Sequence, residues 1–115
     1  MDVPVSHISL SDYPLPMFDA DSEARPAVPA AARQLHDTML AHRGVYIATP
    51  EINASLPPLL KNMLDWVSRV RESKSPFRHC VFAIGSAADE RRGGDYALIA
   101  LRQVLELGLG ALVIP

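Results

Sequence analysis

Cysteine and aromatic residues are scarce in this chain of 115 residues, which has one cysteine and only 6% phenylalanine, tryptophan and tyrosine. A lone thiol cannot form an intrachain disulfide, and no cysteine pair has metal-ligand spacing. The four histidines also lack the spacing of a metal site, so we expect neither a metal centre nor a catalytic histidine. We expect Cys80 to be an inert packing residue in a reducing, cytoplasmic compartment.

The chain also lacks an excess of charge of one sign and any long apolar run. Its formal net charge is −2 and its basic residues are scattered, so no basic stripe is present to bind nucleic acid. No apolar stretch approaches the roughly 18 residues of a membrane helix, and the N-terminus lacks the pattern of a secretion signal. We therefore expect no nucleic-acid partner, no membrane insertion and no secretion. The hydrophobic content of 49% is typical of a globular protein, here a single domain over 1–115.

What the sequence does contain is an alternation of short apolar runs and amphipathic stretches. Prolines disfavour regular structure over 11–29. Strands are predicted at 3–10, where the apolar alternation is imperfect and suggests a sheet edge, and at 45–48, 81–84 and 111–114. Helices are predicted at 30–42, at 95–107, and after 45–48, where Ser55 is the candidate N-cap. This order implies parallel strands joined by right-handed crossovers, in a three-layer α/β fold with helices on both faces.

The loop 50–58 joins the second predicted strand to its helix. In open α/β sheets, ligands bind outside the carboxyl ends of the strands, where this loop would lie. Pro57 and Pro58 lack amide hydrogens and Glu51 adds a negative charge, so the helix start is a poor phosphate site. The backbone of 51–54 and the amide of Asn53 suit a flat, neutral, hydrogen-bonding ring. Composition alone favours an ordinary strand-to-helix connection with an Asn or Ser cap.

The order of residues in this region is more specific than its composition. The stretch TPEINASLPPLLKNMLDWVSR resembles the motif of the NADPH-dependent FMN reductase family, flavodoxin-like enzymes in which a PEYN-G/S turn precedes a helix reading LKNAIDW-S-R. In this chain Ile52 replaces the usual tyrosine and Ala54 the usual glycine. The shared positions are Pro50, Glu51, Asn53, Leu60, Lys61, Asn62, Asp65, Trp66, Ser68 and Arg69.

A second loop, 85–94, also resembles a family segment, in which a serine or alanine turn is followed by a glycine pair and a helix with an LR-VL pattern. On its own, this loop would be an ordinary mobile connection with a solvated charge run. The resemblance implies that Arg91 or Arg92 meets the phosphates of the nicotinamide cofactor. It implies no catalytic side chain. The flavin-side residues that it implies are Pro50, Glu51, Ile52, Asn53, Ser55, Ser86, Gly93 and Gly94.

The activity implied by the resemblance is that of an NAD(P)H-dependent flavin or quinone reductase. FMN and NAD(P)H are the implied cofactors, and a small-molecule electron acceptor is the implied partner. The helix that carries Trp66 commonly contributes to a dimer contact in the family, so a homodimer or higher homo-oligomer is expected, with Trp66 at the interface.

The resemblance covers only the middle and later parts of the family fold. The family's central first strand and its Ser- and Arg-containing phosphate loop lie upstream of a segment resembling 3–10. The expected domain is therefore flavodoxin-like and incomplete at the N-terminus. A truncated chain is the favoured explanation, and a short protein with a differently closed sheet or a strand supplied by a partner are the others. The alternative function is a non-catalytic flavodoxin-like interaction module, or an inactive fragment, without bound FMN.

Overall fold

The computed structural model describes residues 2–19, 21, 28–71, 73–89, 91 and 93–115. Within these residues a parallel sheet has the strand order β1-β2-β3, which confirms the predicted α/β class. The strands are β1 (Gly44–Thr49), β2 (Val81–Ser86) and β3 (Leu112–Val113). The helical elements are η1 (Leu10–Asp12), α2 (Ala30–Leu40), α3 (Pro58–Val67), α4 (Pro76–His79), α5 (Asp95–Arg102) and η2 (Gln103–Gly108).

The register between β1 and β2 brings their carboxyl ends to the same level. The two strands pair over six positions, from Gly44 with Val81 to Thr49 with Ser86. Because the strands are parallel, the loops that follow them leave the sheet side by side. The outer edge of β1 has no strand partner in the described part of the chain.

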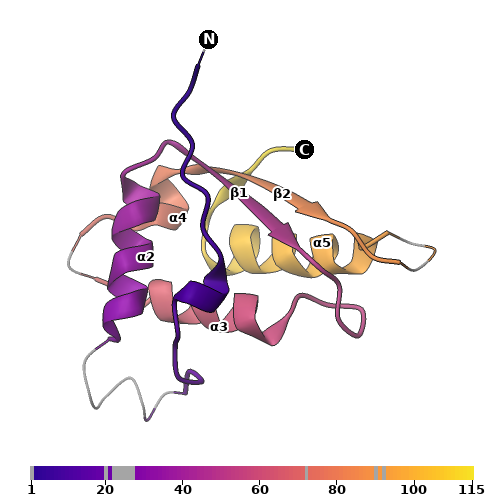
Figure 1. Ribbon diagram of the computed structural model, residues 1–115, viewed down its shortest axis with the longest axis horizontal. Coiled ribbons are helices and arrows are strands. Elements are labelled where there is room, and N and C mark those ends of the chain that lie inside the picture. The colour runs from indigo at the N-terminus through magenta and orange to yellow at the C-terminus, as the bar shows by residue number, and fades with distance from the viewer. Residues whose placement is uncertain (1, 20, 22–27, 72, 90, 92) are drawn as a thin grey trace.

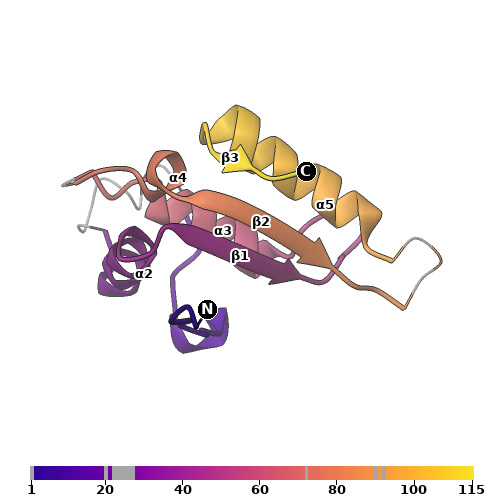
Figure 2. The same ribbon diagram turned by 90° about the horizontal axis from the view of Figure 1, so that it is seen from above.

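One face of the sheet is covered by helices. Figure 1 shows α3 and α5 on the same side of β1 and β2, and in Figure 2 the strands lie in front of α3. The apolar residues of α3, spaced three and four positions apart, point into the core between the helices and the sheet. The buried core residues are Leu35, Met39, Ile47, Leu60, Met63, Leu64, Val67, Phe77, Cys80, Phe82, Leu101, Leu105, Ala111 and Val113.

The described helices do not form the second layer that the sequence predicts for the opposite face. There Tyr46 is 68% exposed and Leu112 is 66% exposed. The physical reason is the order of the strands. Each parallel crossover moves one position in the same direction, and two right-handed crossovers in the same direction place both helices on the same face.

The predicted strand at 3–10 is wrong. The segment before η1 joins no ladder and lies on the outer side of β1 (Figure 2), with Val5 86% exposed. The apolar side chains of residues 3–9 alternate imperfectly, and all of them remain exposed. A hydrogen bond of 3.0 Å between Ser6 Oγ and His42 Nε2 ties the segment to the residues after α2.

The expectation that Trp66 lies at a subunit interface is also wrong, because its side chain is only 1% exposed within its own chain. Its indole Nε1 donates a 2.6 Å hydrogen bond to the carbonyl oxygen of Pro16. Asn62 Nδ2 donates to the same oxygen at 3.0 Å, and Asn62 Oδ1 accepts from the amide of Phe18 at 2.8 Å. The Phe18 ring meets Trp66 edge-on at 5.1 Å. Two residues of the α3 motif therefore anchor the loop that follows η1.

Two helix boundaries differ from the predictions. Helix α3 begins at Pro58 with Pro57 at the N-cap, so Ser55 does not cap it. Helix α5 ends at Arg102 and continues as the π-helical η2 to Gly108, where Leu109 N donates to the carbonyl of Val104. The predicted helix 95–107 is thus present as two consecutive helical types.

Cys80 is buried as expected, and its Sγ lies 3.2 Å from the carbonyl oxygen of Met39 and 3.3 Å from that of His42. Burial raises the pKa of the Cys80 thiol above its ordinary value of 9.0. The folded state therefore holds the thiol proton more tightly than the unfolded state. We expect the resulting stability to be complete below pH 9 and to be lost as pH rises through the folded pKa.

This pH dependence is measured by urea unfolding of the wild type and of Cys80→Ala between pH 7 and pH 10. Other groups titrate in this range, so the informative quantity is the difference in unfolding free energy between the two proteins. That difference should shrink above pH 9. A difference that stays constant to pH 10 would show that the thiol titrates alike in both states.

Candidate functional site

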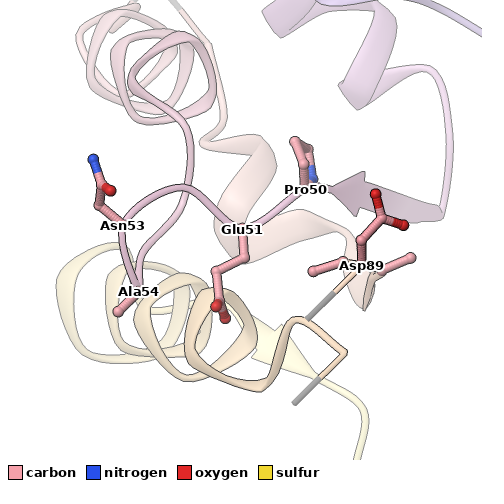
Figure 3. A pocket seen from close by; sticks show the side chains of 7 residues that line it. Pro50, Glu51, Asn53, Ala54 and Asp89 are labelled. Atoms are coloured by element: carbon pink, nitrogen blue, oxygen red, sulfur yellow. The ribbon is translucent and has the colours of Figure 1, made fainter. Parts of the chain in front are cut away.

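The site lies at the carboxyl edge of the sheet, between the loop after β1 and the loop after β2. A cavity of about 540 Å³ separates these loops (Figure 3). Its volume is in the range typical of sites for small molecules and cofactors. The residues that line it are Pro50, Glu51, Asn53, Ala54, Ala87, Ala88 and Asp89.

A tight turn shapes the first loop. The amide of Ile52 donates to the carbonyl of Ser55 at 2.9 Å, and the amide of Ser55 donates back to Ile52 at 3.0 Å. The two central residues, Asn53 and Ala54, have φ values of 49° and 63°. Positive φ at both central positions is the signature of a type I′ turn, for which Asn-Gly is the preferred pair. Ser55 therefore closes this turn through its backbone.

Because Ala54 holds a left-handed φ, we expect Ala54→Gly to raise the unfolding free energy by up to about 1 kcal/mol. Glycine adopts this φ without the steric cost that a Cβ imposes. The matched control is Asn53→Gly, which should gain less because asparagine tolerates left-handed φ. Urea unfolding of both variants measures the effect, and a loss of stability in Ala54→Gly would contradict it.

Glu51 connects the two sides of the site. It is half-buried, and its Oε1 accepts a 3.0 Å hydrogen bond from the amide of Ala97, in the first turn of α5. Figure 3 shows the Glu51 side chain directed toward α5, with Asn53 and Asp89 on opposite sides of it. The N-cap of α5 is Gly94, which offers no side-chain cap.

The end of β2 packs tightly against the start of α5. Gly94 has a φ of 96°, and a Cβ on it would lie 2.2 Å from Ser86 Oγ. That hydroxyl oxygen is buried and has no hydrogen-bond partner within the described residues. Gly93 has a φ of 60° but faces open space. Glycine thus permits a positive φ at both positions, and at Gly94 it also permits close packing against Ser86.

The ionisable side chains among the residues lining the cavity are both acids, Glu51 and Asp89. This lining suits a neutral ring with hydrogen-bonding edges and disfavours a phosphate. Arg91 is exposed outside the lining, and Arg92 lies outside the described residues. In the part of the chain that the structure describes, no group of three His, Cys, Asp or Glu residues is placed to hold a metal, and no helix is long and apolar enough to cross a membrane.

The residues predicted from the sequence all lie in or beside the two loops, but only some of them face the cavity. Pro50, Glu51 and Asn53 line it. The predicted residues that do not line it are Ile52, Ser55, Ser86, Gly93 and Gly94. Sequence reasoning did not name Ala87, Ala88 or Asp89 as site residues. Their place directly after the predicted strand 81–84 was the available signal, since β2 ends level with β1.

A parallel sheet with a cavity between the loops at adjacent carboxyl ends defines an open α/β domain, the class in which ligands bind at this edge. Residues 1–115 match the sequence profile of the NADPH-dependent FMN reductase family, and the chain belongs to this family. The family resemblance is thereby confirmed.

Individual relatives agree with this assignment. The chain is 35% identical to the quinone reductase of Escherichia coli K12 over 97 residues, which are 84% of this chain and 50% of the relative. It is 35% identical to the NAD(P)H-dependent FMN reductase PA1204 of Pseudomonas aeruginosa over 103 residues, 89% of this chain and 54% of the relative. The chain thus spans about half the length of these relatives.

The fold is also similar to a solved structure, the flavoenzyme NAD(P)H:(acceptor) oxidoreductase FerB from Paracoccus denitrificans. The TM-score is 0.75 at 24% identity, over 92% of this chain and 55% of that one. This likeness supports the flavodoxin-like fold.

Proposed function

We propose that this chain carries the ring-binding part of an NAD(P)H-dependent flavin or quinone reductase. The observation that supports it most directly is the turn at 52–55, which presents the family motif to a cavity at the carboxyl edge of the sheet. When bound, FMN would supply the redox chemistry, taking a hydride from NAD(P)H and passing electrons to a small acceptor such as a quinone.

The chain's own residues would bind and orient the ring. The backbone groups of the turn and the Asn53 amide offer donors and acceptors to its polar edge. Pro50 and the exposed Ile52 side chain would exclude water from its apolar part. No side chain of the cavity is needed as an acid or base.

The phosphate of FMN is not expected to bind among the residues that line this cavity. The two acids would repel a phosphate, and Pro57 at the N-cap of α3 and Pro58 at its first position lack amide donors. We therefore assign only the ring to these loops. The proposal also includes a single domain over 1–115, a homodimer or higher homo-oligomer, and a cytoplasmic location, which suits the unpaired thiol of Cys80.

A titration with two flavins tests this proposal. Riboflavin lacks the phosphate that FMN carries, so we expect the chain to quench the fluorescence of both, with affinities within a few-fold of each other. Bound FMN should bleach when NADPH is added. Asn53→Gly keeps the positive φ and removes the amide, and it should weaken binding roughly 2- to 10-fold. A chain that binds neither flavin would favour the alternative, a non-catalytic interaction module.

A further inference from the structure

The start of α5 is satisfied by a residue from a different loop. The first backbone amides of a helix have no partner within the helix, and the N-cap side chain normally supplies one. Gly94 at the N-cap has no side chain to offer. The Glu51 carboxylate, 46 positions earlier in the chain, accepts from the Ala97 amide instead.

We propose that Glu51 is a positioning residue that locks the two loops of the site together through the amide of Ala97. Its role in ring binding rests on the function proposed above. The side chain would act through α5 and the loop before it, and only the backbone of Glu51 would meet the ring.

The burial of Ala97 makes the loss of this hydrogen bond costly in free energy. Ala97 is fully buried, so Glu51 and not solvent satisfies its amide in the folded protein. An unpaired buried amide is costly, and a hydrogen bond to an ionised acceptor is stronger than one between neutral groups. The closed contact is therefore favoured even before any ligand binds.

Charge favours the same arrangement. The N-terminal end of a helix carries a partial positive charge, which stabilises a nearby carboxylate. Glu51 thus places an internal anion at the start of α5. While the contact is closed, this helix start is unavailable to the phosphates of a dinucleotide, which agrees with the acidic lining of the cavity.

The contact joins a residue that lines the cavity, Glu51, to the first turn of α5, whose Ala97 does not line it. Glu51 follows β1, and α5 follows the loop whose Ala87, Ala88 and Asp89 form the other wall. Tying the first wall to the helix that follows the second wall would limit how far the two walls can move apart. A preformed site binds more tightly because less ordering is needed when the ligand arrives.

The experiment compares Glu51→Ala and Glu51→Gln with the wild type. Glutamine keeps an oxygen acceptor of the same length, so it should restore most of what alanine loses. Amide exchange at Ala97, followed by NMR without ligand, should be about tenfold faster in Glu51→Ala and close to the wild-type rate in Glu51→Gln. Riboflavin affinity should fall several-fold in Glu51→Ala and recover in Glu51→Gln. Asp89→Asn is the matched control, since it removes the other cavity acid and should leave Ala97 exchange unchanged.

The two measurements separate the two proposals. Unchanged Ala97 exchange in Glu51→Ala would overturn the lock, whatever riboflavin does. Faster exchange with equal riboflavin affinity in Glu51→Ala and wild type would overturn its positioning role. Faster exchange in Glu51→Ala, with a wild type that binds no riboflavin, would support the lock and overturn the proposed function.

Discussion

Trp66→Ala is expected to lower the free energy of unfolding by about 3 to 5 kcal/mol. The indole is 1% exposed and fills a cluster with Ala32 and Val70. Its removal would leave a cavity and free the edge-on Phe18 ring. The Pro16 carbonyl would lose its 2.6 Å donor and the loop after η1 would lose one anchor. Urea unfolding followed by far-UV circular dichroism measures this, because the variant has no tryptophan fluorescence.

Trp66→Phe is the control that separates packing from hydrogen bonding. It keeps an aromatic ring in the cluster and removes the indole donor, while Asn62 still donates to Pro16. We expect a smaller loss, about 1 to 2 kcal/mol. A Trp66→Ala loss below about 1 kcal/mol would contradict the packing role that the burial of the indole predicts.

Gly94→Ala has the second large expected effect, a loss of about 2 to 4 kcal/mol in unfolding free energy. Alanine is strained at a φ of 96°, and its Cβ would lie 2.2 Å from Ser86 Oγ and 2.7 Å from Ser86 Cβ. The start of α5 must move away from β2 to accept it. Because Ala97 lies in the same turn, we also expect weaker riboflavin binding.

Gly93→Ala isolates the cost of conformation. Its φ is 60°, but an added Cβ meets nothing within 4 Å, so we expect a loss of only about 1 kcal/mol. The double variant Gly94→Ala with Ser86→Gly should regain part of the stability lost by Gly94→Ala, because the clashing side chain is gone. Thermal unfolding of the three variants measures these differences. Equal losses at Gly93 and Gly94 would rule out the clash with Ser86.

The sequence predicted those parts of the fold where local pattern and burial agree. Strands β1 and β2 are short apolar runs bounded by polar loops, and both appear within two residues of the predicted ends. The apolar face of α3 is equally explicit, with Leu60, Leu64 and Val67 buried. These elements form because their apolar side chains are buried away from water, and the spacing of apolar residues along the sequence predicts that burial directly.

The parts that failed depend on distant partners. A strand at 3–10 needs a neighbouring strand, and no described residue provides one. Ser55 is a good cap by type, but the bond that it makes is a backbone bond to Ile52 within the turn. Trp66 is large and amphipathic enough for an interface, and only the fold shows that Pro16 and Phe18 cover it. Residue type alone does not specify such contacts.

The sequence predicted where the candidate site lies better than it predicted the contacts within the site. The motif located both loops, and the disfavouring of phosphate followed from Pro57, Pro58 and Glu51. The bond from Glu51 to the Ala97 amide was not predictable, because it joins residues 46 positions apart and depends on the register of β1 with β2. Ala87 and Ala88 were missed because they contribute only shape.

The open edge of β1 also bears on how the chain behaves in solution. The strand GVYIAT contains no charged residue and no proline, the two devices that commonly prevent edge strands from pairing with other chains. The strand itself therefore supplies no charge repulsion at this edge and leaves salt little to screen. Colloidal stability should accordingly depend on protein concentration much more than on ionic strength, and light scattering across a salt series is the corresponding measurement.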